Sequence, residues 1–531
     1  MYHQPASSSL IKILQMKSLF TLLLLATASI SFSQDWPLKK IVMDKKANKV
    51  LFAQLPAFSF IANKSLPQRG VYVELKLNGS FSSQLLQQRP EAIEMAVPLG
   101  NGKSIICELV KFSLGNILVT ENNERTIENL KVPVTYRGIV AGVADRNAVM
   151  LTINEDYMSL VASMNGKSIQ VTQADEKDKS LYRLYNSETV QFPSVALDCG
   201  TINSAVSKTA GGIDLTGVQI NPLAVQDKCV NVFVDCSDSM YQWRQSNAQQ
   251  VTNYVYELFN IVAGGYLAEQ INIQITTINV WTTASPYRAV VRETALLQMG
   301  AFWKDNFWGN ICVGLDFSLN RTARNGRSGI AGDIGKVKAV SSNTCPAYDS
   351  VKKKSACCYN DLNYGFVYTN FPTGPNTTQA QVYLVMHEMG HLLGSSHTHW
   401  CGWKLSSNPD VYGAIDSCAA PEGSCAKGPP PAGGTGTIMS YCNGNVGINY
   451  ANGFGPLPGN AIRNFVEQSA CILTCVQCFG IRNNSNKELY AFQNNTAPVK
   501  KESEAGESSK EPVNKQPYAG NLIINTQKLK Q

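Results

Sequence analysis

The chain has 531 residues, a net charge of +7, 44% hydrophobic residues and 16% charged residues. These values are typical of a globular protein of two or three domains, and they exclude a chain that is disordered or membrane-embedded throughout. The sequence contains no basic stripe with interleaved aromatic residues, which argues against nucleic-acid binding.

The N-terminus has the pattern of an export signal. An apolar run from Leu19 to about Ala28 follows a lysine, and small residues lead up to Ser33. We therefore expect residues 1–33 to be a cleaved signal peptide, with Met16 as a candidate true start, and the mature protein to be secreted. The alternative is a membrane anchor. An apolar run this short does not cross a bilayer comfortably, so we expect no stable membrane insertion.

Residues 34–200 contain short runs in which apolar and polar residues alternate. Examples are "GVYVELKLNG" at 70–79 and the segment 148–172. A period of two is the pattern of a half-buried strand, so we predict a β-rich, mostly antiparallel domain. Over 201–227 the composition changes to Ser, Thr, Gly and Ala, which is typical of an exposed linker.

Another pattern begins at residue 228 and continues to about 478. "CVNVFVDC" at 229–236 indicates a buried strand, and 271–281 and 310–318 indicate two more. The segment from Ser246 has helical spacing, with its apolar residues on one side. Strands that alternate with long helices predict a mixed layer architecture, and the chain as a whole is assigned to the α+β class.

Fifteen cysteines fit an exported protein, because disulfides form in oxidising compartments. We expect disulfides rather than metal ligands for most of them, and the odd number leaves at least one thiol without a partner in the chain. The Cys-x-x-Cys spacing at 471–478 is compatible with a metal knuckle, but disulfides fit better. Residues 479–531 are polar and low in aromatic residues, and we expect a disordered tail.

Four of the five histidines lie in "VMHEMGHLLGSSHTHW", residues 385–400. His387 and His391 are four residues apart, so a helix places both imidazoles on one face, where they can bind one metal ion. Glu388 can then activate a water molecule on that ion as a general base. Gly394 favours a left-handed turn that ends the helix, and the returning chain brings His397 to the same ion.

Three histidines with a fourth position left for water describe a catalytic zinc site. The alternative is a core helix that carries two satisfied histidines. The concentration of histidine and the added glycine and third histidine argue against that alternative. His399 follows closely, and we expect it at the surface, with a substrate contact or a hydrogen bond to a ligand as alternatives.

A second motif, "GTGTIMSYC", occupies residues 434–442. "HEMGHLLGSSH" followed by "TIMSY" resembles the metzincin zinc endopeptidases, in which a Met-turn forms a hydrophobic floor under three histidines. The resemblance makes Met439 that methionine. It also makes Tyr441 similar to a tyrosine of astacins and serralysins that can bind zinc and stabilise the transition state. A core aromatic with a bonded hydroxyl is the alternative for Tyr441.

The region from about 228 to 478 most resembles the reprolysin-like (adamalysin) branch, through "NRTARNGRSGIAGDIG" and its many cysteines. "YRGIVAGVADRNAVMLTI" at 136–153 resembles a reprolysin propeptide. The implied fold is a metzincin catalytic domain, with a twisted mixed sheet, long helices and zinc in the cleft, preceded by a β-rich propeptide over 34–200. Thr398 departs from this branch, because adamalysins usually carry Asp after the third histidine.

The resemblance implies a secreted zinc endopeptidase made as a zymogen, with one catalytic Zn²⁺ and with proteins or peptides as substrates. It leaves room for a structural Ca²⁺, for which no residue is singled out. "LDCGT" makes Cys199 similar to the adamalysin cysteine switch, and a disulfide with Cys107 is the alternative. Processing would then fall in 201–227. The alternative function is a catalytically inactive binding or adhesion protein on a metzincin scaffold, and a zinc amidase or esterase is a third hypothesis.

Overall fold

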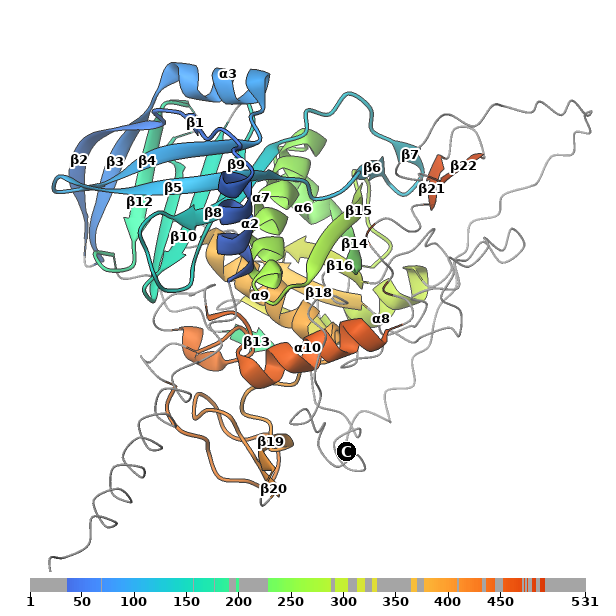
Figure 1. Ribbon diagram of the computed structural model, residues 1–531. Coiled ribbons are helices and arrows are strands. Elements are labelled where there is room, and N and C mark those ends of the chain that lie inside the picture. The colour runs from blue at the N-terminus through green and yellow to red at the C-terminus, as the bar shows by residue number, and fades with distance from the viewer. Residues whose placement is uncertain are drawn as a thin grey trace, which may run out of the picture. The chain divides into compact units, whose positions relative to one another are not determined.

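The structure is a computed structural model of the chain (Figure 1). It describes residues 36–67, 69–155, 157–175, 177–190, 197–199, 228–287, 292–303, 313–319, 327–331, 364–369, 377–407, 410–431, 436–444, 452–469, 472, 475, 480–483 and 488–491. The predicted signal peptide and the predicted linker over 201–227 lie outside these residues. The chain divides into two units, Met1–Phe492 and Gln493–Gln531, and only the first contains described residues. None of the described helices is long and apolar enough to cross a membrane.

The N-terminal part of the chain forms a ten-stranded sheet. Its strands lie in the order β1 (Ala53–Gln54), β4 (Ala92–Gly100), β5 (Lys103–Phe112), β8 (Val134–Val140), β9 (Asn147–Ile153), β10 (Met158–Met164), β11 (Lys167–Gln173), β12 (Leu181–Asn186), β3 (Gly70–Leu77) and β2 (Phe58–Leu66). Neighbouring strands are antiparallel except for β1 and β4. Helices α2 (Pro37–Ala47) and α3 (Gly79–Gln88) belong to the same part of the chain. The predicted β-rich, mostly antiparallel N-terminal region is confirmed.

Two tight hairpins of this sheet follow directly from an Asn-Gly pair. Asn101 and Gly102 join β4 to β5, with φ angles of 51° and 72°. Asn165 and Gly166 join β10 to β11, with φ angles of 49° and 72°. Both central residues of a type I′ turn need positive φ, and Asn-Gly is the pair that adopts it most readily.

A second, mixed sheet contains the strands of the C-terminal part. Its order is β13 (Leu197–Cys199), β17 (Arg327–Ala331), β18 (Tyr364–Thr369), β16 (Val313–Leu319), β14 (Cys229–Cys236), β15 (Asn272–Val280), β6 (Leu118–Glu121) and β7 (Arg125–Thr126). The pairs are parallel apart from β17–β18 and β6–β7. The strands predicted at 229–236, 271–281 and 310–318 are β14, β15 and β16. Both edges of this sheet, β13 and the β6–β7 pair, come from the predicted propeptide region.

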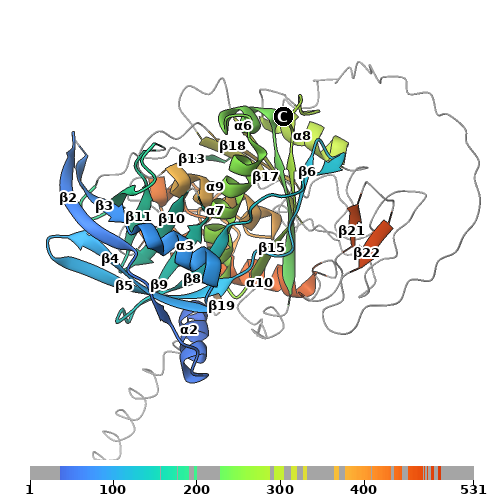
Figure 2. The same ribbon diagram turned by 90° about the horizontal axis from the view of Figure 1, so that it is seen from above.

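Helix α7 (Ala248–Leu267) lies against both sheets. It begins at Asn247, whose side chain accepts hydrogen bonds from the backbone N–H groups of Gln249 and Gln250. It contacts β8 and β9 of the first sheet, β15 of the second and helix α9 (Thr377–Leu392), beside which it runs in both views (Figure 1, Figure 2). Every residue of 251–267 except Glu257 is buried. The predicted helix is confirmed, and its burial extends beyond the predicted apolar side because neighbours cover the helix all round.

The remaining described elements complete the C-terminal part. They are α6 (Asp238–Trp243), α8 (Arg292–Trp303), α10 (Pro456–Gln468), a 3₁₀ turn at Tyr441–Gly444, and the strand pairs β19 (Trp403–Ser407) with β20 (Asp410–Gly413) and β21 (Gly480–Asn483) with β22 (Glu488–Ala491). The last pair lies in the segment for which the sequence predicts no regular structure. Disulfides join Cys229 to Cys475, Cys401 to Cys425 and Cys418 to Cys442. The expected disulfide role of the 471–478 cluster is confirmed for Cys475.

Candidate metal centre

The two histidines of the HExxH motif lie on helix α9, in the interior of the molecule. His387, Glu388 and His391 are each at most 1% exposed. The helix ends where the sequence predicts, because Gly394 has a φ of +96° and its N–H donates to the carbonyl of His391 at 2.9 Å. The chain then reverses and brings His397 back to the helix, as the sequence predicts.

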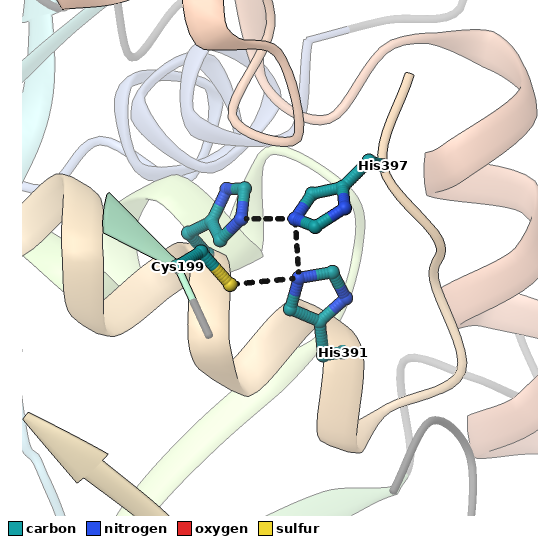
Figure 3. A group of neighbouring side chains, drawn as sticks. Cys199, His391 and His397 are labelled. Carbon is teal, nitrogen blue, oxygen red and sulfur yellow. Dashed lines mark hydrogen bonds between the residues drawn. The ribbon is translucent and has the colours of Figure 1, made fainter. Parts of the chain in front are cut away.

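The three imidazoles converge on one point. Nε2 of His397 lies 3.1 Å from Nε2 of His387 and 3.0 Å from Nε2 of His391 (Figure 3). Nitrogen ligands at about 2.0–2.1 Å from a tetrahedral zinc ion are separated by roughly 3.3 Å. The spacing of the three nitrogens is therefore close to that of a zinc site.

The other ring nitrogen of each histidine has an acceptor beside it. Nδ1–H of His387 donates to the carbonyl of Ile438 at 2.8 Å, and Nδ1–H of His391 donates to the carbonyl of Ser395 at 2.8 Å. Nδ1–H of His397 donates to the carboxylate of Glu422 at 2.7 Å. Since carbonyl and carboxylate oxygens only accept, all three protons are assigned to Nδ1, and three Nε2 lone pairs face one another. Such an arrangement is repulsive until a cation lies between the nitrogens.

Burial keeps these imidazoles neutral. It lowers the pKa of His387 to about 3, and it also lowers the pKa of His391 and of His397. Positive charge on neighbouring histidines lowers each pKa further, whereas the hydrogen bond to Glu422 partly opposes the effect at His397. The neutral imidazole is the form that binds a metal ion, so the site is ready for one at neutral pH.

Glu422 is a site residue that the sequence does not mark. Its Oε1 lies 2.7 Å from Nδ1 of His397 and 3.3 Å from Nε2 of His399. Burial alone raises the pKa of Glu422, but the hydrogen bonds from the two histidines outweigh this effect and lower it to about 2. No spacing rule connects Glu422 with the HExxH motif. The fold of the segment after the third histidine brings Glu422 to His397.

The expectation that His399 lies at the surface is wrong. It is 3% exposed, and its ring stacks on that of His397 with centroids 4.8 Å apart and planes 11° apart. Its carbonyl accepts from the N–H of Glu422 at 2.9 Å, and the Cys401–Cys425 disulfide closes the same loop. The loop folds back over the third histidine and covers His399.

The segment around Met439 lies directly under the helix, as the metzincin resemblance implies. Met439 is 0% exposed, and a Cβ atom on Gly390 would lie 2.7 Å from its Sδ. The adjacent carbonyl of Ile438 orients His387, as described above. Thr398 bonds to the same turn, since its N–H and its Oγ1 donate to the carbonyl of Met439 at 3.1 and 3.3 Å. The residue that departs from the adamalysin pattern thus ties the third-histidine segment to the Met-turn.

Tyr441 lies at the edge of the histidine cluster. Its hydroxyl oxygen is 3.3 Å from Nε2 of His397, and its ring lies 5.1 Å from that imidazole and 4.9 Å from His399. Burial raises the pKa of Tyr441 far above its ordinary value, and nearby acidic groups raise it further. The phenol therefore keeps its proton and can donate a hydrogen bond beside the nitrogens.

Cys199 lies at the fourth side of the cluster. Its Sγ is 3.5 Å from Nε2 of His391 and 3.6 Å from Oε2 of Glu388 (Figure 3). This sulfur and the three Nε2 atoms all lie within 4.8 Å of one another. Cys107 is buried inside the ten-stranded sheet, where burial raises the pKa of its thiol to about 12. The alternative of a disulfide between Cys107 and Cys199 is not realised.

A buried HExxH helix, a glycine turn, a third histidine and a methionine turn are the structural features of the metzincin class. Residues 226–452 match a family model, Reprolysin_5, described as metallo-peptidase family M12. This region is a reprolysin-like metzincin domain, as the resemblance predicts. Among solved structures, metalloproteinase-II from Bacteroides fragilis is similar at 10% identity and a TM-score of 0.33, over 60% of this chain and 85% of that chain.

Proposed function

We propose that the protein is a zinc-dependent endopeptidase that hydrolyses proteins or peptides, with His387, His391 and His397 as the zinc ligands. The observation that carries this proposal is the convergence of three Nε2 lone pairs whose Nδ1 partners fix the tautomer. Zinc accepts three such nitrogens and keeps a further position for chemistry. Bound there, it would act as a Lewis acid that polarises the scissile carbonyl and favours ionisation of water.

We assign to Glu388 the role of the general base. Its Oε2 faces the same space as the sulfur of Cys199, on the open side of the three nitrogens. A carboxylate at this place can take the proton of the attacking water and then deliver it to the amine that leaves. Tyr441, which keeps its phenolic proton, can donate a hydrogen bond to the oxyanion that develops on the former carbonyl.

We also propose that the chain is made as a zymogen and exported. The position of the Cys199 thiol beside the three histidines supports this proposal, since a sulfur there would exclude water and the substrate carbonyl. On this proposal residues 1–33 direct export, residues 34–200 form the propeptide and a cut within 201–227 begins activation. The position of Cys199, so close to the predicted cleavage region, supports this order of events.

The test compares two forms of the secreted protein on casein, an unfolded substrate, after removal of the block by Cys199→Ala. One form has Glu388 intact and the other carries Glu388→Ala, and the zinc content of both is measured. We expect hydrolysis by the first form only and one zinc ion in each. If both forms bind zinc and neither cleaves casein, even after a cut within 201–227, the endopeptidase proposal is wrong.

A further inference from the structure

The hairpin formed by β6 and β7 closes one edge of the mixed sheet of the C-terminal part, the sheet that contains β14 and β15. It comes from the N-terminal part of the chain and pairs in parallel with β15, from Leu118 opposite Thr277 to Glu121 opposite Val280. The backbone N–H of Asn122 also donates to the carbonyl of Val280 at 3.0 Å. Without this hairpin, β15 would be an edge strand with unpaired backbone groups, which is a site of aggregation.

Side chains extend this pairing into the interior of the sheet. Oδ1 of the fully buried Asn279 accepts from Oγ1 of Thr120 at 2.9 Å and from the N–H of Asn123 at 2.8 Å. Nδ2 of Asn279 donates in turn to Asp235, also fully buried, at 2.8 Å. Removal of the hairpin would leave the oxygen of Asn279 without these two donors, and a buried acceptor without a donor is costly.

The ten-stranded sheet makes a second interface with helix α7, and polar groups are buried within it. Nε of Arg137, which is 4% exposed, donates to Oδ1 of Asn260 at 2.9 Å. Nδ2 of Asn260 donates to the carbonyl of Leu151 at 2.9 Å and to Oγ1 of Thr152 at 3.0 Å. These bonds connect the N-terminal sheet to the helix that supports α9, and they are satisfied only while the two parts remain together.

Apolar packing continues across the same interface. Residues of α2, β5, β8, β9 and β10 belong to one hydrophobic cluster with residues of α7, α9, α10, β14 and β15. The packing is close, since a Cβ atom on Gly264 of α7 would lie 3.0 Å from the side chain of Met150. The N-terminal part therefore shares a hydrophobic core with the C-terminal part, which contains the three histidines, instead of packing only on its surface.

The contact that Cys199 and strand β13 make at the histidine cluster is much smaller than the interface of the N-terminal sheet. Strand β13 pairs with β17 over three residues, Leu197 to Cys199. The sulfur of Cys199 then meets His391 and Glu388 at 3.5 and 3.6 Å. Withdrawal of this short strand breaks few bonds, whereas withdrawal of the N-terminal sheet breaks the shared core and exposes the edge of β15.

We propose that residues 36–190 remain a permanent, non-covalently held part of the peptidase after the chain is cut, so that the mature protein consists of two associated pieces. This proposal rests on the proposed processing within 201–227. The association of the two pieces does not depend on catalytic activity. Opening of the site then requires the departure of β13 alone. The surface of α7 and the edge of β15 are the binding surface, and the partner is the chain's own N-terminal domain.

The experiment uses the full chain with a recognition site for a sequence-specific protease inserted between Gly211 and Gly212. The protein is cut under native conditions and passed over a size-exclusion column, and a non-reducing gel identifies the pieces. We expect both pieces to elute together at the position of the uncut chain and to separate only in urea. Separate elution of the pieces in native buffer, whether the C-terminal piece stays soluble or aggregates, would overturn the proposal.

A variant pair tests whether the described interface holds the pieces. Asn260→Leu keeps the branched shape of the side chain but removes its hydrogen bonds to Arg137, Leu151 and Thr152, and it should raise the dissociation constant of the cut pieces at least tenfold. Thr252→Val is the matched control, because the buried hydroxyl of Thr252 donates only within α7, to the carbonyl of Ala248 at 2.8 Å.

If Asn260→Leu does not fold, as judged by circular dichroism, Tyr157→Phe replaces it. This change removes the hydrogen bond from the tyrosine hydroxyl to the carbonyl of Asn253, which measures 2.8 Å. Separation of the cut variant at the same urea concentration as the cut parent contradicts the proposal. Casein hydrolysis by the uncut Cys199→Ala chain is scored separately, so failure of the association and failure of the peptidase function are distinguishable.

Discussion

The carboxylate of Glu422 accepts a hydrogen bond from Nδ1–H of His397 at 2.7 Å, and the same oxygen lies 3.3 Å from Nε2 of His399. One acid thus holds both the third histidine and the imidazole stacked on it. A carboxylate behind a metal-binding histidine fixes the ring and makes its other nitrogen a stronger donor to the metal.

Glu422→Gln should therefore weaken zinc binding by roughly 10- to 100-fold. The amide can still accept a hydrogen bond, but it carries no charge to strengthen His397. Competition with a chromogenic chelator measures the affinity, and Glu155→Gln is the control, because Glu155 is an exposed partner of Lys131 far along the chain. Equal affinities for parent and Glu422→Gln would show that Glu422 serves only the shape of the loop.

Cys199→Ala should release activity in the uncut chain. The change removes the sulfur beside His391 and Glu388 and leaves the backbone pairing of β13 in place. Hydrolysis of a fluorogenic peptide is the measurement, with Cys107→Ala as the control that alters a buried thiol of the other sheet. A Cys199→Ala chain as silent as its parent, when the cut parent is active, would place the block elsewhere.

Tyr441→Phe should lower kcat by roughly 10²-fold and leave zinc content and KM nearly unchanged. The expectation follows from the loss of one hydrogen-bond donor to the oxyanion, which acts in the transition state rather than on the bound substrate. Tyr412→Phe on the exposed part of β20 is the control. A rise in KM at constant kcat would instead assign the hydroxyl to substrate binding.

The zinc-free protein should lose stability as the pH falls below 6.5. The folded state holds the pKa of His387 at about 3, against 6.5 for an unperturbed imidazole, so the unfolded state binds more protons between these values. Each such histidine contributes about 1.4 kcal/mol of lost stability per pH unit in this window. Urea unfolding of the chelator-treated protein at pH 7 and pH 5 gives the comparison.

Zinc should oppose this loss of stability below pH 6.5, since the metal occupies the nitrogens that the protons would take. The urea midpoint of the zinc-free protein should be lower at pH 5 than at pH 7. The dependence of this midpoint on pH should be weaker in His387→Gln. A midpoint that is the same at pH 7 and pH 5 would contradict the buried, neutral state of the three imidazoles.

The three proposed histidine ligands could be predicted from sequence because their geometry is local. His387 and His391 are related by one helical turn, and Gly394 has a backbone preference that needs no distant partner. Glu422 and the burial of His399 could not be predicted, because the loop closed by Cys401 and Cys425 brings them together. Sequence spacing does not predict how such a loop folds.

The same distinction applies to the sheets. An alternating pattern predicts a strand, but it does not name the neighbour of that strand, so the pairing of residues 118–121 with β15 has no signal in the sequence. Helix α7 shows the same limit. Its spacing predicts a helix with one apolar side, and only the shared core explains why nearly every position from 251 to 267 is buried.

The β6–β7 hairpin also bears on the order in which the chain is assembled. Residues 118–126 leave the ribosome well before residues 272–280, so the strand that borders β15 exists before β15 does. A chain that begins at residue 228 would have to build its sheet without this neighbour. Synthesis from the N-terminus thus makes the β6–β7 hairpin first, and strands β14 and β15 can pair beside it once they have been made.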